Sequence, residues 1–546
     1  MQSNPTLQEA FRFYRQGNRL KARQVCHEYL RKWPGDANGR HLMAILSADD
    51  GNADEAIRIL REILLTTPND GRVHRTLGKV LVRAGRMGEA VAATEAALEL
   101  IPHDSDIYLD LSTLHLTRRE PAKAEAVLRD AMARSPSNTK VLSNLAGLLS
   151  ARGERAEAIL RLQQAVAVEP SSAQLHFNLA IGLKAANEID GAIEHYRQAI
   201  ALQPDLADAH LNLANLLIDL GRVDEAAAFY ESGTKARRAV GGRVDDRQET
   251  FRKTNPSKLH HDIEQLNYLI ERGRLPAQYR AVVQDYQSAL AALPPWLPGM
   301  TTTDLPVVLG PKLAPHYNRL VYGPESAAVP DSAVNPALDR AAIEGDYRRN
   351  APGITYLDNF LTAEALEQLH RFCLEATVWF QCRYAGGYLG AFMDDGFCSP
   401  LLLRIAAELP RSLPGIFGKH TLRKQWAFKY DSRLSGIPIH ADFAAINVNF
   451  WVTPDDANLD PDGGGLVVWD KEAPLDWDFA RYNNDQPAIR QFLSKNNARA
   501  INVPHRQNRA VIFNSDLFHE TARLRFRSGY ENRRINITML YGRRSG

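Results

Sequence analysis

The chain has 546 residues, 45% of them hydrophobic and 24% charged, which is enough for several folded cores and excludes a wholly disordered polypeptide. Sixty-six Lys and Arg residues against sixty-four Asp and Glu residues leave a formal net charge of +2, which disfavours a general nucleic-acid-binding or membrane-surface protein. The four cysteines show neither disulfide-framework density nor a CxxC metal spacing, and no apolar stretch approaches the ~18 residues that span a bilayer. We therefore expect a soluble cytoplasmic protein without a membrane partner.

The first 238 residues contain an internal repeat with a period of 34 residues. Three sets of residues recur at this period: the prolines Pro34, Pro68, Pro102, Pro136, Pro170 and Pro204; the alanines Ala22, Ala56, Ala90, Ala124, Ala158, Ala192 and Ala226; and the small residues Ala10, Ala44, Gly78, Ser112, Ala146, Ala180 and Ala214. Small residues let two helices cross closely, and a proline ends the second helix. This pattern resembles the tetratricopeptide repeat, which implies an all-α solenoid of about seven helix pairs over residues 1–238.

One polar row within the repeats suggests a binding groove. Asn144, Asn178 and Asn212 each lie two positions before a small buried residue, and two helical residues turn by about 200°, so the amides should face the open groove. The row resembles the asparagine ladder of O-linked N-acetylglucosamine transferase, which grips a peptide backbone. The resemblance implies a polypeptide partner, because a carboxamide both donates and accepts hydrogen bonds. The alternative is a solvated row that only keeps the inner helices soluble, and towards the N-terminus the row becomes Asp110 and Thr76.

Residues 239–345 read as a bridge. Apolar residues at helical spacing predict one helix over 258–276 and a second over 276–295, after which Pro and Gly become frequent and predict loop-rich packing.

In residues 346–546 the 34-residue repeat is absent, and the hydrophobic pattern becomes that of short strands. From Ile354 the sequence predicts a short strand and then a helix capped by Thr362. Beyond residue 420 the segments WAFKY, AINVNFWV, GGGLVVW, RAVIFNS and RINITMLY predict short, aromatic-rich strands. We expect a mostly β domain of the jelly-roll type with flanking helices.

Two HxD motifs occur in the chain, and predicted structure separates them. In a strand, residues i and i+2 project from one face, so His440 and Asp442 could ligate one ion. His260 and Asp262 lie in a predicted helix, where the same spacing points side chains about 200° apart. We therefore reject the second pair as ligands and expect two solvated helix residues.

A third ligand should come from a separate strand, and His519 follows an apolar strand in NRAVIFNSDLFHE. Two imidazoles and one carboxylate form the facial triad of non-haem iron(II) oxygenases, which leaves three cis positions for a bidentate oxo-acid and dioxygen. Zinc would prefer a fourth protein ligand or softer donors.

From about residue 350 to the end, the chain resembles the iron(II)/2-oxoglutarate dioxygenases. The matching pieces, in the family's order, are DNFLTAEALEQL, the block from Tyr430 to Asp442, GGGLVVW, His519 and a downstream arginine strand. The resemblance implies a double-stranded β-helix with Fe(II) held by His440, Asp442 and His519. It also implies 2-oxoglutarate and O2 as cosubstrates, with decarboxylation to succinate and CO2 coupled to hydroxylation. A halogenase is disfavoured because Asp442 supplies the carboxylate ligand.

The far carboxylate of 2-oxoglutarate should be held by a cation, and arginine can do so in bidentate fashion. In Arg533-Arg534-Ile535-Asn536-Ile537-Thr538, strand alternation places Arg534, Asn536 and Thr538 on one face. This face resembles the R-x-N-x-T strand of alkylation-repair dioxygenases, and Tyr430 resembles the tyrosine that donates to the same carboxylate. Three other arginines remain rivals for the role: Arg533, Arg527 and Arg525.

The leading hypothesis is a dioxygenase that hydroxylates a protein or peptide side chain recruited by the repeat groove. The alternatives are a small-molecule oxygenase whose repeats serve assembly, and a non-enzymatic scaffold with a relic barrel. A nucleic-acid substrate is disfavoured by the balanced charge, although the C-terminal arginines keep it open.

Overall fold

A computed structural model describes residues 5–241, 251–295, 300–306, 310–324, 329–384, 387–431 and 436–544. The chain forms two compact units, Met1–Leu202 and Gln203–Gly546. This division falls one helix pair before the boundary predicted from the repeat. Within the described residues, no helix is both long enough and apolar enough to cross a membrane.

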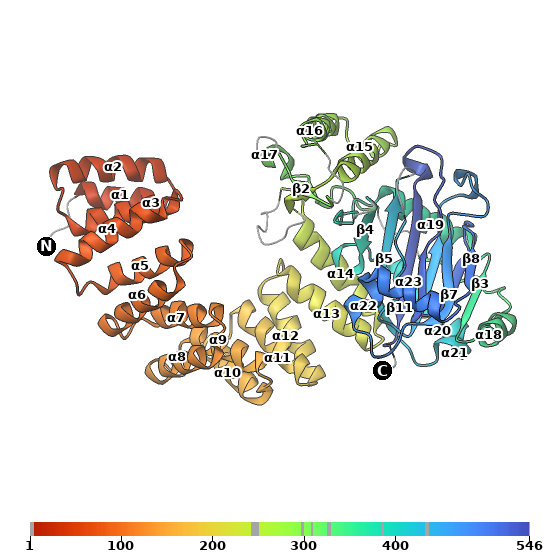
Figure 1. The fold of residues 1–546 in the computed structure, drawn as a ribbon, viewed down its shortest axis with the longest axis horizontal. Coiled ribbons are helices and arrows are strands. Elements are labelled where there is room, and N and C mark those ends of the chain that lie inside the picture. Colours follow the sequence, from red (N-terminus) through yellow and green to blue (C-terminus); the bar gives the residue numbers. More distant parts are fainter. Residues whose placement is uncertain are drawn as a thin grey trace. The chain divides into compact units, whose positions relative to one another are not determined.

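The first unit consists of antiparallel helix pairs that stack in chain order (Figure 1). Its helices are α1 (Pro5–Arg15), α2 (Arg19–Lys32), α3 (Ala37–Asp49), α4 (Ala53–Thr66), α5 (Gly71–Arg83), α6 (Met87–Leu100), α7 (Ser105–Thr117), α8 (Pro121–Arg134), α9 (Thr139–Ala151), α10 (Arg155–Val168), α11 (Ala173–Ala185) and α12 (Ile189–Leu202). Every helix predicted from the 34-residue period is present.

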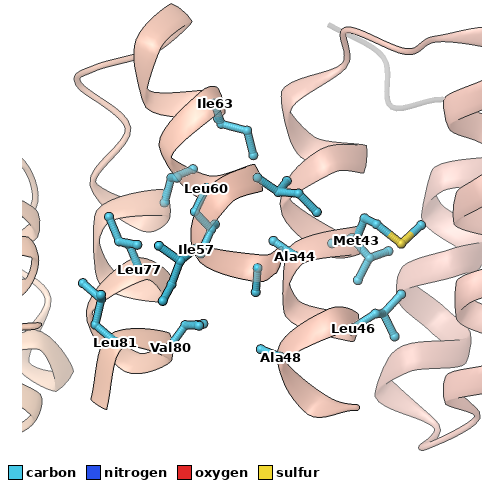
Figure 2. Packing of buried hydrophobic residues seen from close by; sticks show 14 of the residues in the cluster. Met43, Ala44, Leu46, Ala48, Ile57, Leu60, Ile63, Leu77, Val80 and Leu81 are labelled. Carbon is cyan, nitrogen blue, oxygen red and sulfur yellow. The ribbon is translucent and has the colours of Figure 1, made fainter. Parts of the chain in front are cut away.

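The two series of small residues lie where the helices cross, as predicted. Ala44 of α3 and Ala56 of α4 are fully buried, and the equivalent residues of the other repeats are buried in the same way. Figure 2 shows side chains from α3, α4 and α5, among them Ala44, Leu60 and Leu77, packed into one layer. A larger side chain at the crossing points would force neighbouring helices apart.

Glycines end the first helix of most pairs because the turn needs a left-handed residue. Gly85 and Gly153 have φ values of 74° and 86°. Arg119 and Asn187 occupy the same turn position at φ 62° and 66°, so the left-handed conformation is kept in the two repeats that lack the glycine.

The second unit begins with the last helix pair and the bridge. Its helical elements and short strands up to residue 349 are α13 (Ala207–Asp219), α14 (Val223–Arg238), β1 (Lys253–Thr254), α15 (Pro256–Glu271), α16 (Tyr279–Ala291), β2 (Thr303–Asp304), α17 (Gly310–Leu313) and α18 (Arg340–Arg349). The two helices predicted for the bridge are α15 and α16, and the following described residues are mostly loop, as predicted.

The remainder of this unit contains two antiparallel sheets with flanking helices (Figure 1). The elements are β3 (Ile354–Leu357), α19 (Ala363–Glu375), β4 (Leu389–Phe392), η2 (Met393–Asp395), α20 (Pro400–Ser412), α21 (Pro414–Phe417), β5 (Leu422–Tyr430), β6 (Ile446–Trp451), η3 (Asp455–Ala457), β7 (Leu466–Glu472), α22 (Phe479–Asn484), α23 (Gln486–Lys495), β8 (Ala500–Val503), β9 (Ala510–Asn514), β10 (Leu517–Thr521), η4 (Tyr530–Asn532) and β11 (Arg534–Tyr541). The six-stranded sheet has the order β3-β9-β6-β11-β5-β4, and the three-stranded sheet has the order β10-β7-β8.

Strand register gives the large sheet two different faces. On the inner face, Arg534 pairs with Tyr430 and Thr538 pairs with Trp426, and side chains of this face share a core with the small sheet. The outer face is covered by helices: Lys429 Nζ donates to a carbonyl at the end of α19, and the Tyr541 hydroxyl donates to a carbonyl of α20. Residues that alternate along β5 and β11 therefore have opposite environments.

Candidate metal and carboxylate site

His440, Asp442 and His519 form one cluster, although 77 residues separate the last two in sequence. One possible ligand atom from each residue lies within 4.8 Å of the others, and this is the single such cluster among the described residues. His519 Nε2 is 3.5 Å from Asp442 Oδ2, and His440 Nε2 is 3.9 Å from Asp442 Oδ1. Cis ligands about 2.1 Å from one ion lie about 3 Å apart, so an ion would fit with a small contraction.

Backbone hydrogen bonds orient both imidazoles. His440 Nδ1 is 2.9 Å from the carbonyl oxygen of Pro438, and His519 Nδ1 is 3.1 Å from that of Leu517. A carbonyl oxygen can only accept, so each Nδ1 carries the proton and each Nε2 has a free lone pair directed at the cluster. Metal-binding histidines are held in this way.

The HxD motif lies outside regular strand, which corrects the prediction. His440 exchanges two backbone hydrogen bonds with His519 as an isolated bridge, and β6 begins only at Ile446. The next two backbone amides donate to different segments, at Tyr482 and Ser515, which ends the pairing after one residue. Both predicted ligands nevertheless face the cluster.

The electrostatics of the cluster favour a neutral His440 beside an ionised carboxylate. Burial, followed by repulsion from His519, lowers the pKa of His440 to about 4. Burial alone would raise the pKa of Asp442, but polar contact with His519, the proximity of His440 and the hydrogen bond from Asn447 hold it below its usual range. Neutral imidazole and carboxylate are the forms that ligate metals.

Arg534 lies at the start of β11 on the inner face and is 1% exposed. Its Nε donates to the carbonyl oxygen of Gly464, and its Nη2 donates to that of Gly465 at 3.2 Å. A Cβ atom at Gly465 would lie 1.9 Å from the carbonyl oxygen of Val503, so glycine is required for this close approach. The glycine-rich segment before β7 thus brings backbone oxygens to the guanidinium.

No carboxylate among the described residues forms an ion pair with Arg534. Burial lowers the pKa of its guanidinium to about 10, with Tyr430 partly opposing the shift. Several buried polar atoms near it have no hydrogen-bond partner: Arg534 Nη1, the Tyr430 hydroxyl, Trp451 Nε1, Asn536 Oδ1 and both ring nitrogens of His505. The guanidinium carbon is 4.9 Å from the Tyr430 ring and 5.7 Å from the Trp451 ring. Unpaired donors around a buried cation fit an anionic ligand such as a carboxylate.

The two other cosubstrate residues predicted on β11 have different surroundings. Asn536 Nδ2 and the Thr538 hydroxyl both donate to Asn449 Oδ1 at 2.8 Å. Asn449 and its neighbour Asn447 on β6 were missed from the sequence, although amides at alternating positions of the apolar segment INVNFW are a recognisable signal. Whether Asn536 and Thr538 touch a cosubstrate stays a prediction.

The rival arginines lie elsewhere. Arg533 faces the outer side, where its Nε is 2.8 Å from Glu264 of α15. Arg527 is exposed and lies 3.3 Å from Asp456, and Arg525 is exposed as well. Strand alternation therefore leaves Arg534 alone of the four on the inner face.

The second HxD motif is not a metal site, but one of its residues differs from expectation. His260 is exposed, whereas Asp262 is 6% exposed instead of solvated. Asp262 accepts a hydrogen bond from Lys258 Nζ, and its Oδ1 is 3.0 Å from His261 Nδ1. The physical reason is that α15 packs against the C-terminal fold: Gln265 donates to the carbonyls of Leu374, in the last turn of α19, and Ala376, which caps that helix.

The asparagine row lies outside the packed core. Asn144 is exposed, and Asn178 and Asn212 are half-buried. Asn144 and Asn212 donate to carbonyls of their own helices at 2.9 Å, while Asn178 accepts a hydrogen bond from Gln174. These amides can exchange local partners for a ligand, and their role in peptide binding stays a prediction.

Comparison with known proteins identifies the repeats. Models of the tetratricopeptide repeat match residues 13–80, 75–139, 116–180 and 207–239, and a model described as TPR repeat matches residues 183–221. The N-terminal region therefore consists of tetratricopeptide repeats, which indicate peptide or protein partners. No curated protein sequence matches the chain.

Three solved structures illustrate the similarity. MamA is 19% identical with a TM-score of 0.27, and the match covers 30% of this chain and 95% of MamA. The pilF protein of Pseudomonas aeruginosa is 20% identical with a TM-score of 0.32, covering 36% of this chain and 90% of that chain. YrrB, described as a TPR protein with an unusual peptide-binding site, is 20% identical with a TM-score of 0.28, covering 34% and 95%.

Proposed function

We propose that the C-terminal region is an iron(II)- and 2-oxoglutarate-dependent dioxygenase built on a double-stranded β-helix. The supporting observation is the convergence of His440, Asp442 and His519, whose free Nε2 atoms and carboxylate face one point. Three protein ligands of this type leave positions for an oxo-acid and dioxygen.

Within the proposed site, each residue has a defined task. Arg534 binds the far carboxylate of 2-oxoglutarate through its unpartnered Nη1, and the buried Tyr430 hydroxyl donates to the same group. The inner-face aromatic residues around Tyr430, including Tyr388 and Phe428, exclude water from this carboxylate. Iron held by the triad would supply dioxygen activation, with one oxygen atom entering succinate and the other a hydroxylated substrate.

The proposed substrate is a polypeptide recruited by the repeats. The support is the presence of tetratricopeptide repeats in the same chain, together with exposed or half-buried amides at Asn144, Asn178 and Asn212. An assembly role for the repeats, with a small-molecule substrate, is the second candidate. Oxidised-protein mass spectrometry in cells carrying wild type, His519→Ala or the double variant Asn144→Ala/Asn178→Ala separates the two candidates. A protein modification that is lost in both variants supports recruitment by the repeats. Absence of any protein modification that depends on His519 supports a small-molecule substrate.

The test of the dioxygenase is an anaerobic titration of the full chain with iron(II) and 2-oxoglutarate. A visible charge-transfer band should develop in wild type, be absent in Asp442→Ala, and need much more oxo-acid in Arg534→Ala. His260→Ala is the matched control, because it alters an exposed histidine of the other HxD motif. Absence of the band in folded wild-type protein would refute the proposal and leave a scaffold.

A further inference from the structure

A chain of buried amides connects the two halves of the candidate site. Asn447 Nδ2 donates to Asp442 Oδ2 at 2.6 Å, and Asn449 Nδ2 donates to Asn447 Oδ1 at 2.6 Å. Asn449 Oδ1 in turn accepts from Asn536 Nδ2 and the Thr538 hydroxyl. Each of these five residues is at most 6% exposed, so water does not compete for the bonds.

The hydrogen bonds in this chain all run in one direction. Asn536 donates to Asn449, Asn449 donates to Asn447, and Asn447 donates to the carboxylate. Amide dipoles aligned in series strengthen the last bond, and their positive ends point towards the negative charge. The arrangement therefore fixes the orientation of the Asp442 carboxylate.

Packing alone does not account for these amides. Their strand β6 lies at the centre of the large sheet, where its neighbour β9 presents Val511 and Phe513 on the same inner face. Two asparagines buried in such a layer cost stability unless each donor and acceptor is satisfied, and apolar residues would pack there without that cost. Asn449 and Asn447 instead form consecutive hydrogen bonds that end at the carboxylate of Asp442.

Asn447 also determines which carboxylate oxygen is free. It occupies Asp442 Oδ2, so Oδ1 is the oxygen available for one-atom ligation. Ligation through both oxygens would fill a position that a bidentate oxo-acid needs. We propose that Asn447, held in place by Asn449, is a positioning residue that limits Asp442 to one ligating oxygen. This inference rests on the proposed function.

The experiment measures Mn(II) affinity of the full chain by electron paramagnetic resonance, without turnover. Asn447→Ala should weaken Mn(II) binding by about 10- to 100-fold, as for other residues that orient metal ligands. Asn449→Ala should have a smaller effect, because it acts through Asn447. Asn502→Ala is the control: this asparagine donates to a backbone carbonyl at the surface, and its replacement should leave the affinity unchanged.

Two further measurements keep the outcomes separate. Asn447→Leu preserves volume if the alanine variant fails to fold, and the visible band of the anaerobic iron(II)–oxo-acid complex should shift or weaken in it, which a purely structural role would not cause. Wild-type Mn(II) affinity and an unshifted band in a folded Asn447 variant would overturn the inference while leaving the dioxygenase intact. Failure of the wild-type protein to bind Mn(II) would instead overturn the proposed function.

Discussion

Replacement of Arg534 by methionine should abolish tight binding of 2-oxoglutarate while leaving the fold intact. Burial lowers the guanidinium pKa to about 10, and this shift corresponds to about 3 kcal/mol of unfavourable environment for the cation. A bound carboxylate relieves that cost, so we expect the loss of the arginine to weaken the affinity for 2-oxoglutarate by at least about 100-fold. Methionine is apolar and of similar length, and removal of the buried charge offsets the lost hydrogen bonds to Gly464 and Gly465.

The assay is anaerobic calorimetry with 2-oxoglutarate titrated into Mn(II)-loaded protein, with the thermal midpoint of each variant measured alongside. Arg527→Met is the matched control, because this exposed arginine was a rival on sequence grounds and forms an ion pair with Asp456 at the surface. The variant Arg534→Lys should recover little affinity, since an ammonium lacks the planar fork. Wild-type affinity in folded Arg534→Met would refute the assignment of the carboxylate to this residue.

Four further variants test the stability of the fold. Gly147→Ala should raise the free energy of unfolding by about 1 kcal/mol, because this helical glycine has open space around it. Gly85→Ala should lower the free energy of unfolding by about 1 kcal/mol, because φ is 74° at this position. Denaturant midpoints that move in the same direction in both variants would contradict these predictions. Burial, then a nearby lysine, lowers the pKa of His370 to about 4, so the unfolded chain takes up the proton first and stability should fall by up to about 3 kcal/mol between pH 6.5 and 4. In His370→Phe, unfolding curves across that range should lose this component, and an unchanged slope would exclude it. Glu264→Gln leaves the buried Arg533 without its closer carboxylate, so it should lower the free energy of unfolding of the second unit by about 2 kcal/mol. The thermal midpoint of that unit should fall accordingly, and an unaltered melting curve would show the ion pair to be dispensable.

Local patterns were enough for most of the elements and for the three residues that converge in the candidate site. The 34-residue period places small residues at helix crossings, because close approach of two helices tolerates little else. Alternation along β11 separated Arg534 from Arg533 before their surroundings were known, since successive strand residues face opposite sides. The short strands β4, β8 and β10 were not predicted. Their own composition is a weak strand signal, and they are strands because they form hydrogen bonds with neighbouring strands.

The sequence by itself determined which side chains could hold a metal and a carboxylate, because those roles depend on residue chemistry and on spacing within one segment. Only the tertiary structure decided what surrounds them. Asp262 is buried rather than solvated because α15 packs against α19 and against Arg533, a residue more than 250 positions later in the chain. The amide chain from Asn536 to Asp442 exists because β6 and β11 are neighbours, and hydrogen bonding across strands depends on register that no single segment encodes.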